Sequence, residues 1–194
     1  MSGISGDYRI FVGAFPQGEI AARIQALRER LDPKTARITP PHVTLAGTYW
    51  RSGPAVPESE RELVSRLKAL DGQIPAFSLL LGGVHSFPPA ERPVIYLGMD
   101  LTPPINAARA ALLEAAGTDK HAQFVPHLTL AMRLPAAEAR AVVEELQVSQ
   151  WHTGRQIAPI DELWLMQRGA DDPAWRCIAR VRLRNEASDA PRSG

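Results

Sequence analysis

The chain has 194 residues, 45% of them hydrophobic, which suits one large domain or two closely packed lobes with a real core. Its 22 basic and 21 acidic residues nearly balance, which argues against sequence-independent binding to long duplex DNA, since that binding needs a large basic surface. The single cysteine, Cys177, excludes an intramolecular disulfide and is expected to be a buried, inert thiol. Without an apolar run of membrane-spanning length or an N-terminal signal pattern, we expect a cytoplasmic protein with no membrane partner.

The spacing of apolar residues predicts an alternation of strands and helices along the chain. The first part is expected to contain strands at 8–15, 42–50 and 76–87 and helices at 18–31 and 57–70. The second part is expected to contain strands at 92–100, 127–134, 151–160, 162–169 and 174–183 and helices at 103–117 and 135–147. The polar residues 185–194 are expected to form a disordered tail. No Gly/Ser linker separates the two parts, so they should pack together.

A repeat at an offset of 85 residues organises this pattern. Residues 10–46 align with residues 95–131 without a gap, and 12 of the 37 pairs are identical. The agreement runs through a strand, a helix and a second strand, and it includes the segment Pro-His-x-Thr-Leu-Ala at 41–46 and 126–131. Such self-similarity indicates a duplication with a pseudo-twofold axis between two lobes. We therefore predict a single duplicated domain over 8–184, with repeat units at about 8–50 and 93–134.

The repeated histidine and threonine are two residues apart, so within a strand they lie on the same face. His42 and Thr44 then share one face of the first lobe, and His127 and Thr129 share one face of the second. The leucine that follows each threonine points to the other face, where the amphipathic helices are expected to cover it. If the axis brings the polar faces together, two imidazoles and two hydroxyls converge on one cleft.

This combination of groups suits the hydrolysis of a phosphate ester. Histidine titrates near neutral pH, so one imidazole can take a proton from water while the other donates a proton to the leaving oxygen. Threonine hydroxyls can donate hydrogen bonds to the non-bridging phosphate oxygens. No metal or other cofactor is required, because the protonated imidazole and the hydroxyls supply the electrophilic groups.

Paired His-x-Thr motifs in a duplicated α+β chain resemble the 2H phosphoesterases, in particular the 2′-5′ RNA ligase and RNA 2′,3′-cyclic phosphodiesterase group. The resemblance covers about residues 8–184 and includes "LGGVHSFPPAERPVIYLGMD" and "IAPIDELWLMQRG". It implies an α+β fold in which two antiparallel sheets face each other across a central cleft with helices outside. It implies metal-independent hydrolysis of a 2′,3′-cyclic phosphate at an RNA end, and 2′-5′ ligation as the reverse reaction. It also implies that His42, Thr44, His127 and Thr129 are catalytic, with His42 as acid and His127 as base.

Four further residues are candidates for substrate binding. Phe11 and Tyr96 occupy equivalent repeat positions, where they can stack on bases or belong to the core. Trp50 has the strand parity of His42 and Thr44, which places it at the mouth of the cleft, and Arg133 follows the second motif and is a candidate contact to phosphate or ribose. The other histidines, His85, His121 and His152, have no partner at the offset of 85 and are expected at the surface.

Other interpretations of the motifs remain open on the sequence. The two motif histidines could be hydrogen-bonded core residues, and a zinc site would need a third or fourth ligand that does not recur with the motif. The substrate could be a small cyclic nucleotide such as ADP-ribose 1″,2″-cyclic phosphate instead of RNA. The chain could also be a nucleotide- or RNA-end-binding module with little turnover. A monomer is expected, because the chain carries its own twofold axis.

Overall fold

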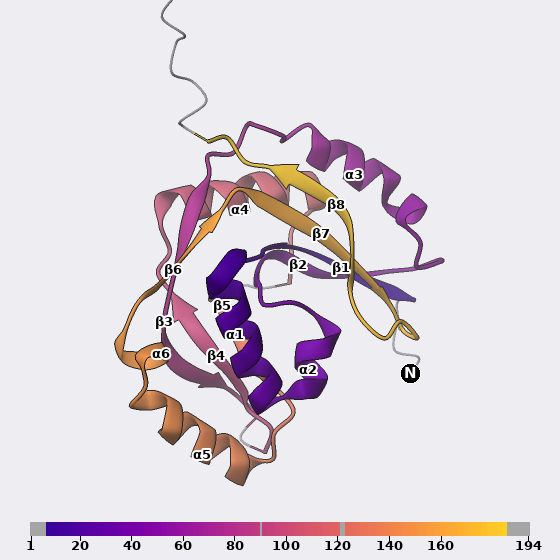
Figure 1. The fold of residues 1–194 in the computed structure, drawn as a ribbon. Helices are drawn as coiled ribbons and strands as arrows, with labels where there is room; N and C mark the ends of the chain where they lie inside the picture. The colour runs from indigo at the N-terminus through magenta and orange to yellow at the C-terminus, as the bar shows by residue number, and fades with distance from the viewer. Residues whose placement is uncertain (1–6, 90, 121–122, 186–194) are drawn as a thin grey trace, which may run out of the picture.

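The computed structural model describes residues 7–89, 91–120 and 123–185 (Figure 1). The strands are β1 (Tyr8–Ala14), β2 (Val43–Arg51), β3 (Phe77–Phe87), β4 (Val94–Met99), β5 (His127–Ala131), β6 (Gln156–Ile160), β7 (Glu162–Gly169) and β8 (Arg176–Arg182). The helices are α1 (Gly18–Leu31), α2 (Pro33–Ile38), α3 (Arg61–Lys68), α4 (Pro103–Ala116), α5 (Ala136–Gln147) and α6 (Gln150–Thr153), with a 3₁₀ turn at Pro57–Glu60.

The strands form a curved antiparallel sheet in the order β6-β3-β4-β5-β2-β1-β7-β8. We call β2, β1, β7 and β8 the first half-sheet, and β5, β4, β3 and β6 the second half-sheet. The halves meet between β2 and β5, where Val43 pairs with Leu128. The two sheets expected from the sequence are therefore the two halves of one strongly curled sheet, and the α+β fold with helices outside is confirmed.

The pseudo-twofold axis passes through this junction. Val43 and Leu128 are 85 residues apart, so equivalent positions of the repeat pair with each other, as a twofold axis requires. The symmetry also extends beyond the stretch that aligns in sequence. The strand β3 begins at Phe77 and β7 begins at Glu162, again 85 residues apart, and each lies beside the first strand of the opposite repeat unit. The two units thus exchange their third strands across the molecule.

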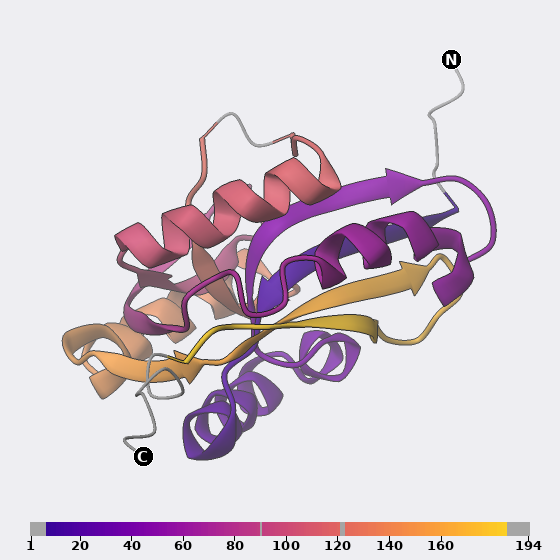
Figure 2. The ribbon, with the colours of Figure 1, turned by 90° about the horizontal axis from the view of Figure 1, so that it is seen from above.

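The helices are exchanged in the same way. Helix α1, which connects β1 to β2, packs against β5 of the other half, and α4, which connects β4 to β5, packs against β2. Figure 2 shows these two helices on opposite sides of the curved layer of strands. The leucines that follow the motif threonines, Leu45 and Leu130, are fully buried in the main core, as their strand parity predicts. The opposite, polar face of both motif strands is left for the cleft.

Two short helices are missing from the predicted elements, and the strand predicted at 127–134 ends at Ala131. Residues 33–38 form a short helix, α2, because Pro33 occupies its first turn and the Asp32 carboxylate accepts a hydrogen bond from the Thr35 backbone N–H at 3.0 Å. Residues 150–153 form α6, capped by Ser149, so the strand predicted at 151–160 begins only at Gln156. In the predicted tail, residues 186–194 lie outside the described residues, as does His121. Among the helices that are described, none is long and apolar enough to cross a membrane.

Candidate active site

The two motifs face each other across the junction of the half-sheets. Because Val43 pairs with Leu128 in an antiparallel register, one step in either direction sets His42 opposite Thr129 and Thr44 opposite His127. All four side chains lie on the face away from the buried leucines. The structure therefore brings together the four residues that the sequence predicts to be catalytic. Each motif contributes its histidine to one cross-strand pair and its threonine to the other.

Both imidazoles are held in the same way. The Nδ1 atom of His42 lies 2.9 Å from the Pro40 carbonyl oxygen, and the Nδ1 atom of His127 lies 2.8 Å from the Val125 carbonyl oxygen. A carbonyl oxygen only accepts, so each Nδ1 carries the proton and donates it. In the neutral ring, Nε2 is then the unprotonated nitrogen. The hydrogen bond from Nδ1 to the backbone also fixes the orientation of the ring. In each ring, Nδ1 is bound to the backbone and Nε2 is left for proton transfer, as general acid–base catalysis requires.

The His42 ring lies in an aromatic environment. Phe11 stacks on it with ring centroids 4.8 Å apart, and Phe15 stacks with centroids 5.2 Å apart. Burial lowers the pKa of His42 to about 4, although its hydrogen bond to the Pro40 carbonyl acts in the opposite direction. The positive charges of Arg28 and His127 lower the pKa of His42 further. His42 is therefore neutral at pH 7 in the free protein.

The His127 ring has a more open surrounding. Phe87 and Tyr96 contact it edge to face, with centroids 4.9 and 5.3 Å away. A cavity of about 300 Å³ is lined by His127 together with Thr44 of the other motif, and by Phe87, Phe124 and Arg109. The cavity is therefore bounded by residues of both halves. It lies beside one motif histidine and one motif threonine, His127 and Thr44.

A buried arginine and a buried aspartate of the first repeat unit hold the second motif strand. Arg28 of α1 donates from Nε to the Thr129 carbonyl at 3.1 Å and from Nη1 to the Thr39 carbonyl at 2.8 Å. Asp32, at the end of the same helix, accepts from the Met132 backbone N–H at 3.0 Å. These backbone hydrogen bonds lower the pKa of Asp32 in spite of its burial, so it is ionised at neutral pH. We call this pair the first clamp.

The second repeat unit holds the first motif strand with a matching pair. Arg109 of α4 donates to the Leu45 carbonyl and forms an ion pair with Asp119 at 2.8 Å. Asp119 accepts from the Gly47 backbone N–H at 3.4 Å. Gly47 and Met132 are equivalent in the repeat, so each unit contacts the same backbone amide of the other unit's motif strand. We call this pair the second clamp; together the clamps fix how the motif strands lie relative to one another.

The residues predicted to bind substrate are placed unevenly. Phe11 is buried under His42, where it forms part of an aromatic cluster with Phe15 and Met166, so it supports a motif histidine and does not offer a free face. Tyr96 has the equivalent place beside His127 and lines an adjoining pocket. Trp50 lies at the far end of β2 and is 48% exposed, with the Arg9 guanidinium over its ring. Arg133 lies beyond β5 and lines a separate depression with Arg92, and its contact to phosphate or ribose stays a prediction.

Sequence reasoning missed the other groups that shape the site. Phe15 and Phe87 flank the two histidines, yet they are not equivalent in the repeat, and the clamp arginines are not equivalent either. In the part of the chain that is described, no three His, Cys, Asp or Glu side chains gather so that they could hold a metal ion. Cys177 is half-buried, and burial raises the pKa of its thiol, as expected for an inert cysteine.

Comparison with known proteins identifies the family of the chain. The family model of the 2′-5′ RNA ligase superfamily matches residues 16–172. A Bacillus cytotoxicus protein named as a candidate phosphoesterase is 31% identical over 145 residues, which cover 74% of this chain and 80% of that protein. A Bacillus cereus protein of the same kind of name is 28% identical over 156 residues, covering 80% and 87%.

Solved structures share the fold at lower identity. E. coli LigT in complex with phosphate is 19% identical, with a TM-score of 0.59 over 93% of this chain and 99% of LigT. TT0787 of Thermus thermophilus is 18% identical, with a TM-score of 0.58 over 92% of this chain and 99% of that protein. The chain belongs to the 2′-5′ RNA ligase superfamily, the 2H phosphoesterases, and it is a phosphoesterase of that class.

Proposed function

We propose that the protein hydrolyses a 2′,3′-cyclic phosphate at an RNA end, without a metal, by acid–base catalysis between its two motif histidines. The observation that carries the proposal is the paired arrangement at the junction: two imidazoles, each held through Nδ1, two threonine hydroxyls on the same face, and a cavity that His127 and Thr44 line from the two halves. E. coli LigT, which shares the fold, has been crystallised with phosphate and with 3′-AMP. These ligands have the chemistry of the product.

The proposed reaction is an in-line displacement at phosphorus. The neutral histidine takes a proton from water, and the resulting hydroxide attacks the phosphorus of the five-membered ring. The bond from phosphorus to one ribose oxygen breaks, and the protonated histidine donates its proton to that oxygen. Thr44 and Thr129 donate hydrogen bonds to the non-bridging oxygens, whose charge grows in the transition state. When an RNA 5′-hydroxyl takes the place of water as the nucleophile, the same ring opening joins the two RNA ends, and the linkage is 2′-5′ when the 3′-oxygen is the leaving group.

The lowered pKa of His42 bears on the division of roles. A ring with a pKa of about 4 is neutral at pH 7, which is the form that a general base needs. This favours His42 as base and His127 as acid, the reverse of the roles implied by the family resemblance. For His42 to act as the acid, the negative charge of the bound phosphate would have to raise its pKa by several units. The two assignments predict opposite responses of the histidine variants to a substrate whose leaving group needs no proton.

The function is tested with an RNA oligonucleotide that ends in a 2′,3′-cyclic phosphate. In the presence of EDTA, the wild-type protein is expected to open the ring to a monophosphate that phosphatase can remove. His42→Ala and His127→Ala should each lose at least about 10²-fold in kcat, because each removes one proton-transfer group. The double variant, purified identically, is the control for contaminating nuclease. Full activity in either single variant would contradict the proposed mechanism. If the wild-type protein leaves the RNA intact, the proposed substrate is wrong.

Two rival functions give different results in the same assay. A phosphodiesterase specific for small molecules would leave the RNA intact and open ADP-ribose 1″,2″-cyclic phosphate or a mononucleotide. A binding module would hold the cyclic phosphate for hours without turnover, and the two histidine substitutions would weaken binding only. Our proposal includes a monomer acting in the cytoplasm, where the single cysteine needs no oxidising environment.

A further inference from the structure

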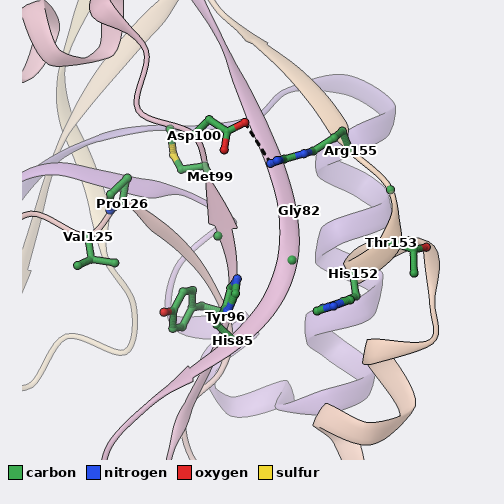
Figure 3. Close-up of a pocket in the computed structure, with 13 residues that line it drawn as sticks. Gly82, His85, Tyr96, Met99, Asp100, Val125, Pro126, His152, Thr153 and Arg155 are labelled. Carbon is green, nitrogen blue, oxygen red and sulfur yellow. Dashed lines mark ion pairs between the residues drawn. The ribbon is translucent and has the colours of Figure 1, made fainter.

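A second pocket adjoins His127 on the second half-sheet. It has a volume of about 520 Å³, and its floor is formed by β3 and β4 (Figure 3). One wall is Val125 and Pro126, which precede β5, and the other is the segment 152–155, which connects α6 to β6. Tyr96 connects the pocket to the motif, because its ring lies 5.3 Å from the His127 ring and 5.6 Å from the His85 ring. The pocket is thus a continuation of the catalytic cleft.

Glycines on the floor of this pocket leave room for the His85 ring to lie close to the sheet. The His85 ring lies against Gly83 and Gly98, where added Cβ atoms would come within 2.8 and 3.3 Å of its Nε2 atom. Gly83 has a φ of +75°, a conformation that other residues rarely adopt. Both this backbone conformation and the close contact with His85 therefore favour glycine at this position. The exposed His85 ring therefore lies on the sheet and leaves the space above it open. A flat group such as a nucleotide base can stack on such a ring.

Polar groups of both kinds face this floor. The Nδ1 atom of His152 accepts a hydrogen bond from the Val84 backbone N–H at 2.9 Å, so the proton of the neutral ring is on Nε2, which can donate. The Arg155 side chain crosses β3 at Gly82, where a Cβ would lie 3.3 Å from its Cδ, and it pairs with Asp100 at 3.2 Å. Both members of this ion pair are more than half exposed. The pocket therefore offers two donors and one carboxylate to a ligand.

The equivalent region of the first half-sheet has a smaller cavity, of about 400 Å³, and Phe15 and Trp164 form part of its lining. Trp164 stacks on Phe15 with ring centroids 4.4 Å apart, and Trp175 contacts Phe11 edge to face at 4.7 Å. These rings occupy the face beside His42 that glycines leave open beside His127. A substrate that extends beyond the cyclic phosphate therefore finds more room on the side of the second half-sheet.

We propose that this pocket binds the nucleotide that precedes the cyclic phosphate, so that the preferred substrate is an RNA end of at least two nucleotides. The inference rests on the proposed function. The phosphate that joins the two nucleotides accepts hydrogen bonds from Arg155 and His152, and the base of the preceding nucleotide stacks on His85. Asp100 accepts from the ribose 2′-hydroxyl, the group by which a protein distinguishes RNA from DNA. The neighbouring Arg155 offsets the repulsion between this carboxylate and the phosphate.

The test compares adenosine 2′,3′-cyclic phosphate with the dinucleotide ApA 2′,3′-cyclic phosphate in steady-state kinetics. We expect the wild-type KM for the dinucleotide to be about tenfold lower, a factor typical of a charge-assisted hydrogen bond to phosphate. Arg155→Ala should raise the dinucleotide KM most of the way to that of the mononucleotide, with kcat unchanged. His152→Asn should act in the same direction by a smaller factor, since the amide oxygen can still accept from Val84. Neither variant should change the mononucleotide kinetics.

Two controls make the comparison specific. Arg30→Ala removes an arginine of similar exposure, 53% against 59%, whose partner Glu145 is as exposed as Asp100, and it should change neither KM. Replacing the preceding nucleotide by its 2′-deoxy form should raise the wild-type KM about threefold, the loss of one hydrogen bond. In Asp100→Ala this difference between ribose and deoxyribose should disappear.

The outcomes separate this inference from the proposed function. If both substrates are hydrolysed with equal KM, or if Arg155→Ala leaves the dinucleotide KM unchanged, the pocket does not bind the preceding nucleotide although the ring-opening activity stands. If neither substrate is hydrolysed, the proposed function fails, and calorimetry with ApA 3′-phosphate then tests the pocket alone. Binding weakened about tenfold by Arg155→Ala supports it, and unchanged binding contradicts it.

Discussion

The two half-sheets carry the same motif but surround it differently. Beside His42, Phe11 and Phe15 fill the cleft face, whereas beside His127 Gly83 and Gly98 leave it open. The catalytic strands themselves have kept the repeat: both histidines donate through Nδ1 to the carbonyl two residues earlier. Under the proposed function, the symmetric part of the molecule would hold the reacting phosphate. The asymmetric part would give the substrate its direction and separate the roles of the two histidines.

The largest expected effect concerns those roles. A substrate with a good leaving group, such as a nucleoside p-nitrophenyl phosphodiester, departs without a proton, so loss of the acid should cost little while loss of the base keeps its full effect of about 10²–10⁴-fold. If His42 is the base, as its low pKa favours, His42→Ala should be severely impaired on this substrate and His127→Ala nearly normal. The opposite result would assign the acid role to His42. Equal losses for both variants would contradict separate acid and base roles.

Much of this site can be read from the sequence because the motif depends on strand parity alone. Histidine and threonine two residues apart must share a face, and the repeat of Pro41–Ala46 at Pro126–Ala131 indicates that two such faces are related by an axis. The same parity correctly predicts that Leu45 and Leu130 are buried. Periodicity also locates the long helices, since Ile24, Leu27 and Leu31 recur on one face of α1.

What sequence reasoning missed depends on tertiary contacts. Strands β3 and β7 lie outside the stretch of the repeat that aligns in sequence. Their exchange between the two units is therefore visible only in the order of the strands in the sheet. Arg28 and Arg109 perform the same task from positions that are not equivalent, because a long guanidinium can reach a backbone carbonyl from several places on a helix. Arg133 follows the motif in sequence, but β5 ends at Ala131, and the depression that Arg133 lines with Arg92 includes neither motif histidine.

The clamps offer the next comparison between the halves. Arg109→Met would leave the nearly buried Asp119 carboxylate without its ion pair, and we expect it to lower the free energy of unfolding by about 3–5 kcal/mol. Arg28→Met would leave the Thr129 and Thr39 carbonyls without a donor, a smaller loss of about 2–3 kcal/mol. Urea denaturation measures both. Recovery of stability in Arg109→Met/Asp119→Leu would identify the buried Asp119 charge as the cause, and no recovery would contradict it.

The aromatic rings beside the two histidines should differ in what they contribute. Phe11 is 3% exposed within its cluster, so Phe11→Ala should cost about 3–5 kcal/mol of stability. Phe87 is only partly buried at the wall of the cavity, so Phe87→Ala should cost about 1–2 kcal/mol and act mainly on KM. Thermal unfolding and steady-state kinetics of the two variants check this contrast. Equal losses of stability would show that both rings are core residues, and this would contradict the proposed difference between the two half-sheets.

The smallest effect we expect is the dependence of stability on pH that comes from His42. Its pKa in the folded protein, about 4, lies below the usual value of 6.5, so the unfolded chain binds a proton more readily between these values. The stability that this provides is complete above about pH 6.5 and is lost as the pH falls toward 4. Because the ring is partly exposed, we expect a loss of about 1–2 kcal/mol, to be measured by urea denaturation at pH 7, 5.5 and 4.5. His42→Gln should remove this part of the slope, and an identical slope in both proteins would mean that His42 titrates normally and that its aromatic surroundings do not separate it from His127.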